Sequence, residues 1–158
     1  MELIKKEIKD NEAVLKIIKG WGSDLLVSRG KTYKTEDLEG ILKYKKNKII
    51  GLGLYYIKNN ECEIVLLETF IQKKGIGTEI IEKIKEIAEI NKCKRVWLIT
   101  SNDNIDAIKF YQRRGFNIAN FYRNAMDESR RLKPTIPLIG NYNIPIKDEL
   151  EFEIKILN

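Results

Sequence analysis

The hydrophobic pattern of this chain changes its period once, at a short turn that carries two glycines, and this change constrains the fold most. Residues 61–71 have the apolar pattern of a strand. From residue 76 onward, apolar residues recur at helical spacing, and charged residues fill the other side of the predicted helix. This apolar stripe consists of Ile76, Ile80, Ile84, Ile87 and Ala88. A strand that enters a long helix through so short a turn predicts a fold with both α and β structure.

Further strands and helices are predicted on both sides of this turn. The strands at residues 40–45, 49–57 and 61–71 are joined by short turns that contain asparagine, so an antiparallel meander is expected. The other expected elements are strands at 2–8, 94–100, 116–122 and 149–156, an extended piece at 25–28, a turn at 35–38, and helices at 12–19, 77–91, 105–114 and 124–132. The predicted fold class is α/β, of the α+β kind, with a mixed, mostly antiparallel central sheet and flanking helices.

The composition excludes several kinds of chemistry. The chain has 158 residues, which suits one domain over residues 1–158 that needs neither a disulfide nor a structural metal. It has no histidine, which excludes a His-based triad, an imidazole base and a histidine-rich metal site. Cys62 and Cys93 are too far apart in the sequence for a CxxC metal or redox motif, and both are expected to be small, reduced thiols. No metal is expected.

The location and the partners of the protein are constrained by its apolar and charged residues. No apolar run reaches the roughly 18 residues that span a bilayer, and residues 1–10 lack a signal-peptide stretch, so a cytoplasmic protein without a membrane partner is expected. The net charge of +6 is concentrated in the first third of the chain. Its densest cluster, at residues 43–48, could bind nucleic acid or form the solvated tip of a hairpin, which Asn47 favours. The acid-rich helix at 77–91 argues against a continuous basic face.

The turn at residues 72–78 has the features of a phosphate-binding loop. Gly75 and Gly77 have no Cβ, so backbone N–H groups can converge on one point. The helix N-terminus adds unpaired N–H groups and a partial positive charge, and Lys73 and Lys74 raise the local potential further. Neither the Walker pattern GxxxxGK[ST] nor the fingerprint GxGxxG is present. The turn therefore predicts a pocket for a phosphate or pyrophosphate, without telling which molecule carries it.

A second segment, at residues 104–116, narrows the choice. Together the two segments resemble the GNAT superfamily of N-acetyltransferases. The first family signature is a Gln or Arg followed by Gly-x-Gly, which Gln72, Gly75 and Gly77 match. The second signature is an Asn, a small residue, an aromatic pair and Gly-Phe, matched by Asn104, Ala107, Phe110, Tyr111, Gly115 and Phe116. The order of strands and helices also resembles this fold through about residue 122.

The resemblance implies where acetyl-CoA, the cosubstrate of this family, would bind. It would lie in a gap between a splayed pair of strands, here residues 61–71 and 94–100. Backbone groups near Phe70 and Ile71 would pair with the pantetheine arm, and the N–H groups of residues 73–78 would hold the pyrophosphate. The implied cofactor contacts are Phe70, Ile71, Gln72, Lys73, Lys74, Gly75, Ile76, Gly77, Thr78, Asn104, Ala107 and Phe110. The stretch between the strand and Gln72 is shorter than in many family members, so the backbone N–H donors could be displaced by about one residue.

The resemblance also implies a mechanism, in which an amine attacks the thioester directly in a ternary complex. Tyr111 matches the usual general acid of the family, which protonates the leaving thiolate; as an alternative, Tyr111 is only an aromatic on the inner face of its helix. Glu68 lies on the strand at the gap and could take the proton of the incoming ammonium, directly or through water. Glu68 could equally pair with a lysine or hold the substrate.

The acceptor stays open at this level. A primary amine is expected, on a small molecule or on a peptide or protein. The Pro-bearing segment at residues 133–147 resembles a bacterial GNAT subgroup of unknown substrate, and it could close over the acceptor side or serve packing or a homodimer. Two other classes of function are kept as alternatives: an acyl-CoA-binding GNAT-like sensor without turnover, and a basic nucleic-acid-binding module.

Overall fold

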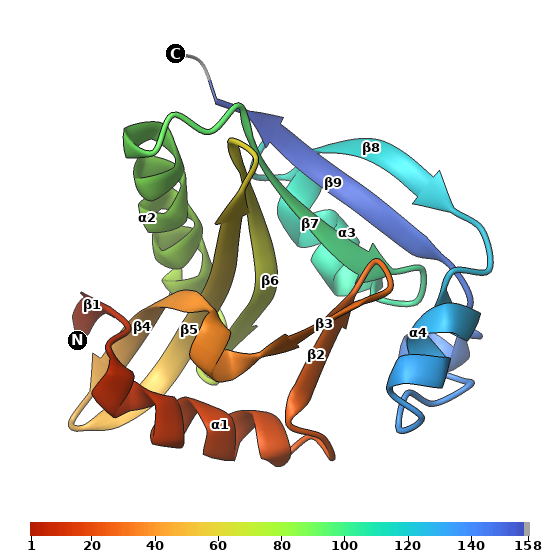
Figure 1. The fold of residues 1–158 in the computed structure, drawn as a ribbon, viewed down its shortest axis with the longest axis horizontal. Helices are drawn as coiled ribbons and strands as arrows, with labels where there is room; N and C mark the ends of the chain where they lie inside the picture. Colours follow the sequence, from red (N-terminus) through yellow and green to blue (C-terminus); the bar gives the residue numbers. More distant parts are fainter. Residues whose placement is uncertain (157–158) are drawn as a thin grey trace.

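The computed structural model describes residues 1–156, which form a large sheet, a small two-stranded sheet and helices on both faces of the large sheet (Figure 1). Seven strands make the large sheet, in the order β1-β4-β5-β6-β7-β9-β8. The strands are β1 (Glu2–Lys5), β2 (Leu25–Ser28), β3 (Lys31–Lys34), β4 (Glu39–Lys45), β5 (Lys48–Lys58), β6 (Glu61–Thr69), β7 (Arg95–Ser101), β8 (Asn117–Tyr122) and β9 (Glu149–Lys155). The helices are α1 (Asn11–Lys19), α2 (Ile76–Ile90), α3 (Ile105–Gln112) and α4 (Met126–Leu132), with the short 3-10 helices η1 (Ile8–Asp10), η2 (Thr35–Asp37) and η3 (Asn141–Asn143). This architecture confirms the predicted fold class.

The middle of the large sheet is split. Strands β6 and β7 are parallel neighbours, but only three residue pairs join them, Glu61 with Arg95, Cys62 with Val96 and Glu63 with Trp97. Beyond these pairs β6 continues to Thr69 and β7 to Ser101, but the two strands no longer pair with each other. Every other pair of neighbouring strands in this sheet is antiparallel. The expected splayed strand pair is therefore present, and its open end lies where β6 leads into α2.

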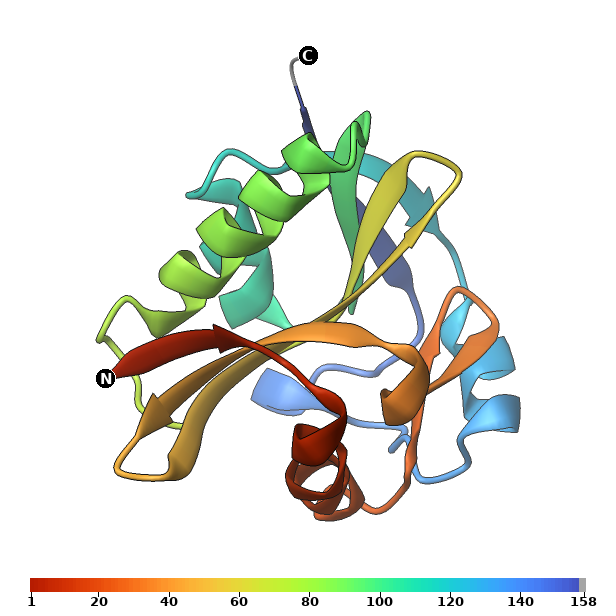
Figure 2. The same cartoon turned by 60° about the vertical axis from the view of Figure 1, so that its left-hand side comes forward.

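Helices α2 and α3 lie on one face of the large sheet (Figure 2) and pack on it through the larger of the two hydrophobic cores. The apolar stripe of α2 is buried there: Ile80, Ile81 and Ile84 have no exposed surface. The helix packs directly on β5 because two strand residues have no side chain. A Cβ on Gly51 would lie 2.6 Å from Cγ2 of Ile76, and a Cβ on Gly53 would lie 2.4 Å from Cγ2 of Ile80. This close contact fixes where the N-terminus of α2 ends up.

Helix α1, the β2–β3 hairpin and α4 lie on the opposite face (Figure 2). Val14 and Ile18 of α1 are fully buried in a second core, against Leu42, Leu52 and Leu54 of the large sheet. This core holds α1 and the hairpin beside the central strands. No helix among residues 1–156 is long and apolar enough to cross a membrane.

Most predicted elements are confirmed, and the differences have local causes. The first strand ends at Lys5 instead of residue 8, because Asp10 accepts the N–H of Glu7 at 2.7 Å and turns the chain into η1. Strand β3 was not predicted, since its four residues contain one apolar side chain. Lys45, Lys46 and Lys48 of the basic cluster do lie exposed at a hairpin tip, where Lys46 and Asn47 have φ of 48° and 59°. Lys43 does not, because it is buried on β4 and pairs with Glu79.

Candidate functional site

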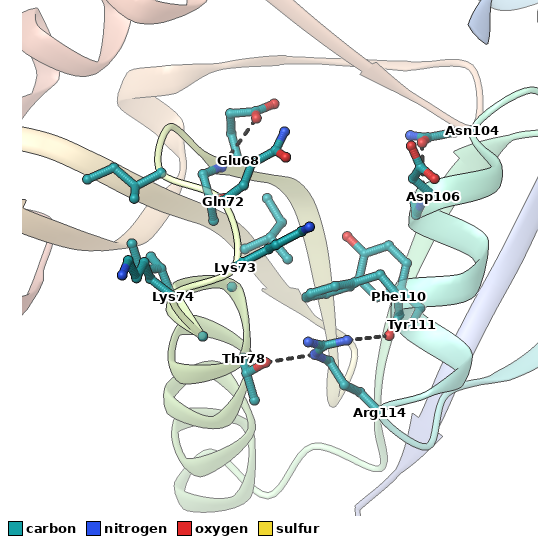
Figure 3. A pocket seen from close by; sticks show the side chains of 17 residues that line it. Glu68, Gln72, Lys73, Lys74, Thr78, Asn104, Asp106, Phe110, Tyr111 and Arg114 are labelled. Carbon is teal, nitrogen blue, oxygen red and sulfur yellow. Dashed lines mark hydrogen bonds between the residues drawn. The ribbon is translucent and has the colours of Figure 1, made fainter. Parts of the chain in front are cut away.

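A cleft of about 590 Å³ lies between the end of β6, the N-terminus of α2 and helix α3 (Figure 3). All but one of the predicted site residues line this cleft: Glu68, Ile71, Gln72, Lys73, Lys74, Gly75, Ile76, Gly77, Thr78, Asn104, Ala107, Phe110 and Tyr111. Four further residues complete the lining, namely Leu67, Thr69, Asp106 and Arg114. The two sequence segments, about thirty positions apart, thus form opposite walls of one cleft.

The turn between β6 and α2 presents a row of unpaired backbone N–H groups. The first helical hydrogen bond of α2 runs from the Glu79 N–H to the Gly75 carbonyl at 3.0 Å, so the N–H groups before it have no helical acceptor. No acceptor is found among the described residues for the N–H groups of residues 73–78. Lys73 and Gly75 have φ of 59° and 71°, and a Cβ on Gly75 would meet nothing within 4 Å. The turn therefore combines free donors with open space beside them, which suits an anion such as a pyrophosphate.

The N-terminus of α2 is held against α3 by a close contact and by an arginine. A Cβ on Gly77 would lie 3.0 Å from Cζ of Phe110, so only glycine lets the two helices approach this far. Arg114 donates from Nε to the Thr78 hydroxyl at 2.8 Å and from Nη1 to the Phe110 carbonyl at 2.9 Å. Its guanidinium carbon lies 3.5 Å from the centre of the Phe110 ring. Arg114 thus joins the walls and adds a positive charge to the cleft.

Asn104 has a structural task that limits what it can offer a ligand. It is the N-cap of α3, and its side-chain oxygen accepts the Ala107 N–H at 3.3 Å. The backbone N–H of Asn104 donates to the Ser101 carbonyl at 3.1 Å. Its side-chain NH₂ group has no acceptor among the described residues and is the group left to bind a ligand.

Tyr111 lies at the centre of the cleft with its ring in the core. The ring packs against Phe110, Phe116 and Phe152, with centroid distances of 5.2, 5.6 and 6.1 Å, and the residue is 8% exposed. Its hydroxyl has no hydrogen-bond partner among the described residues and points into the cleft (Figure 3). Burial, followed by the charge of Glu68, raises the pKa of the Tyr111 phenol well above its ordinary value. The phenol is therefore protonated at neutral pH.

Glu68 faces the cleft from the end of β6 (Figure 3). One carboxylate oxygen accepts the N–H of Thr69 at 3.2 Å, and no lysine or arginine among the described residues pairs with it. Burial raises the pKa of this carboxyl above its usual value, and the hydrogen bond from Thr69 opposes the shift. A carboxylate without a cation and with a raised pKa is a stronger base than an ordinary glutamate. The expected alternative in which Glu68 pairs with a lysine is wrong.

Phe70 is the predicted site residue that the structure does not bring into the cleft, and its assignment is corrected. Strand β6 ends at Thr69, and the N–H of Phe70 still donates to the Ile50 carbonyl at 2.9 Å. This N–H group is therefore not available to a pantetheine arm. The Phe70 side chain lies in a different hollow, between α1 and the β4–β5 turn.

Sequence reasoning missed Asp106 and Arg114 as lining residues. Arg114 had a signal, because it is the second of two arginines that directly precede the Gly115-Phe116 pair of the family signature. Asp106 had one too, since it stands near the start of the helix predicted at 105–114 and lies on the first turn of α3. Neither signal distinguishes a lining residue from a solvated one.

Comparison with solved structures identifies the class of fold. A GNAT family acetyltransferase from Elizabethkingia anophelis with acetyl-CoA bound aligns with a TM-score of 0.71 at 17% identity, over 98% of this chain and 97% of that one. The sequence then identifies the family. The pattern of the acetyltransferase (GNAT) family matches residues 13–116, and the chain belongs to this family of acetyl-CoA-dependent N-acetyltransferases.

Two Bacillus subtilis proteins are similar to the chain in sequence. The uncharacterized protein YxbD is 41% identical over 133 residues, which cover 84% of each chain. A spermine/spermidine N(1)-acetyltransferase is 34% identical over 84 residues, which cover 46% of this chain and 55% of that one. The first similarity extends over most of the chain, and the second over about half.

Proposed function

We propose that this protein transfers the acetyl group of acetyl-CoA to a primary amine by direct attack within a ternary complex. The free N–H groups of residues 73–78, beside the open space at Gly75, carry this proposal, because they would hold the diphosphate of the cosubstrate. The side-chain NH₂ of Asn104 would bind the pantetheine arm. The similarity to a spermine/spermidine acetyltransferase supports an amine as the acceptor.

Two side chains would then move the protons. Glu68 takes a proton from the incoming ammonium, directly or through water, and the neutral amine attacks the thioester carbonyl. The new C–N bond forms, the C–S bond breaks, and the leaving sulfur takes the proton of the Tyr111 phenol. The nitrogen then gives up its surplus proton, which returns Tyr111 to the phenol and leaves the neutral amide. The raised pKa of Tyr111 means that the phenol is protonated before the amine attacks. The unpaired carboxylate of Glu68 and the unpaired hydroxyl of Tyr111 support these roles.

Thermal unfolding with two ligands tests the binding step. Acetyl-CoA is expected to raise the melting temperature, and acetyl-pantetheine, which has no diphosphate, is expected to raise it far less at the same concentration. Lys74→Glu should weaken acetyl-CoA binding, whereas Lys92→Glu, an exposed lysine at the far end of α2, should not. Equal shifts with both ligands would show that the turn does not hold the diphosphate.

Release of free thiol in the presence of mixed primary amines tests the transfer step. Turnover with at least one amine supports the proposed enzyme. Stabilisation by acetyl-CoA without thiol release for any amine would instead support the acyl-CoA-sensing alternative. Salt-sensitive binding of an oligonucleotide without an acetyl-CoA shift would support the nucleic-acid alternative.

A further inference from the structure

The charges that line the cleft are separated along its length. Arg114 and Thr78 lie at one end, Tyr111 lies in the middle with the Lys73 side chain extending toward it, and the carboxylates of Glu68 and Asp106 lie beyond (Figure 3). The two carboxylates come from opposite walls, β6 and α3. Neither has a lysine or arginine partner within residues 1–156, so both negative charges are available to a ligand.

Because of this separation, the two ends of the cleft favour ligand groups of opposite charge. Lys73 and Lys74 belong to the turn that carries the free N–H groups, and Arg114 is bonded to Thr78 at the start of α2, so positive charge attracts an anionic diphosphate to this part of the cleft. Carboxylates repel the same group. The end with Glu68 and Asp106 is therefore the end that favours a positively charged molecule, such as the ammonium form of an amine.

Asp106 is held in place by the loop between α4 and β9. The Tyr142 hydroxyl donates to the Asp106 carboxylate at 2.8 Å. Tyr142 has a φ of 55°, a conformation that is uncommon for a bulky residue and costs energy unless the surroundings hold it. The ring stays 66% exposed, so burial of an apolar side chain does not explain this conformation.

The tip of this loop is fixed against the turn before α3. Asp103, which is 3% exposed, accepts the backbone and side-chain N–H groups of Asn141 at 2.9 and 3.1 Å. Gly140 lies so close that a Cβ would be 2.1 Å from the Asp103 carboxylate. The loop can therefore place Tyr142 beside Asp106 in a defined position, and a further hydrogen bond, from the Asn102 side chain to the Pro145 carbonyl at 2.9 Å, anchors the end of the loop.

We propose that Asp106, oriented by Tyr142, binds a second positive charge on the acceptor while the reacting amine lies at Glu68. The substrate class is then an amine that carries another cationic group, such as a diamine or a longer polyamine. This inference rests on the proposed acetyl transfer and specifies its acceptor. Asp106 is a binding residue in this proposal, and Tyr142 is a positioning residue.

Two probes of equal chain length test the proposal. Putrescine has an amine at both ends, and γ-aminobutyrate has a carboxylate at one end. The wild-type protein is expected to acetylate putrescine with the higher kcat/KM. Asp106→Asn should lower kcat/KM for putrescine by about threefold to fivefold, the upper part of the range for an exposed ion pair, and leave or improve that for γ-aminobutyrate. The change should appear in KM for the amine, with kcat and KM for acetyl-CoA retained.

Further variants separate positioning from folding. Tyr142→Phe should raise KM for putrescine in the same direction and by less, because the carboxylate stays and only its orientation is lost. Glu89→Gln, an exposed carboxylate in the last turn of α2, should leave both probes unchanged. Melting temperatures measured on the same samples identify any variant that fails to fold.

The outcomes separate this inference from the function on which it rests. Equal losses for both probes in Asp106→Asn, or an unchanged preference for putrescine, would overturn the inference. Acetylation of neither probe by a protein that binds acetyl-CoA would overturn it as well and leave the cosubstrate site intact. A wild-type protein that does not bind acetyl-CoA would instead overturn the proposed function.

Discussion

Replacement of Tyr111 by phenylalanine separates the two roles that this residue could have. The ring contacts Phe110, Phe116 and Phe152, and phenylalanine keeps all of these contacts. The hydroxyl has no partner among the described residues, so the variant loses no internal hydrogen bond. We therefore expect the free energy of unfolding to change by less than about 1 kcal/mol, below the net worth of one typical hydrogen bond.

The effect on the reaction should be much larger. A positioned general acid contributes about 100-fold to 10,000-fold, which corresponds to about 2.7 to 5.4 kcal/mol in the activation free energy. Tyr111→Phe should lower kcat within this range, as measured by single-turnover thiol release, and keep the affinity for acetyl-CoA. Because the pKa of Tyr111 is raised, wild-type activity should not decline in alkali before about pH 10, the ordinary pKa of a phenol.

A matched control is available in the same core. Tyr55 has no exposed surface, and its hydroxyl donates to Glu39 at 2.8 Å, away from the cleft. Tyr55→Phe should destabilise the protein by about 0.5 to 1.5 kcal/mol and leave kcat unchanged. If Tyr111→Phe kept its full kcat, Tyr111 would be a core aromatic, and the proton would have to come from another donor.

Three further predictions concern titration, an ion pair and the thiols. Because burial raises the pKa of Glu68, kcat/KM should fall as the pH drops through this raised value, and Glu68→Gln should abolish that acidic limb; an unchanged pH–rate profile would exclude Glu68 as the base. Arg95→Met should cost about 3 to 5 kcal/mol in a urea unfolding experiment, since it leaves the buried Glu151 carboxylate without its cation at 2.9 Å. Burial alone would raise the pKa of Glu151, but hydrogen bonds, led by that of Arg95, lower it. The stability that the ion pair provides should therefore be lost as the pH falls through this lowered pKa. This loss of stability should be smaller in Arg95→Met. Cys62 and Cys93 are fully buried, and burial raises the pKa of Cys62 to about 12, so a thiol reagent should label the protein only after it unfolds.

The elements that the sequence predicted well are those whose pattern is local. The apolar stripe of α2 could be predicted because every third or fourth residue faces the core. The turn before α2 could be predicted because Gly75 and Gly77, which lack a Cβ, stand directly at the start of the helix. The second cleft segment, residues 104–116, was found through its match to a family signature. Strand β3 could not be predicted, because its pairing with β2 gives it regular structure without an apolar pattern.

The rest of the site depends on contacts between distant residues. Phe70 was placed beside the pantetheine arm by the family resemblance, but its N–H donates to the Ile50 carbonyl instead. The approach of Gly140 to Asp103 joins residues 37 positions apart, and the bond from Tyr142 to Asp106 depends on it. No local pattern marks such residues, because their role exists only once the loop between α4 and β9 has folded back.

The three residue pairs between β6 and β7 make the large sheet two half-sheets with a narrow bridge, β1-β4-β5-β6 on one side and β7-β9-β8 on the other. The facing edges beyond this bridge carry main-chain groups that no strand satisfies, so solvent must occupy them until a molecule of matching shape inserts itself as a replacement strand. Such insertion would stiffen the seam between the halves. Amide protons along that seam should exchange with deuterium quickly in the empty protein and slowly in the loaded one, while those of β4 and β5 stay protected in both.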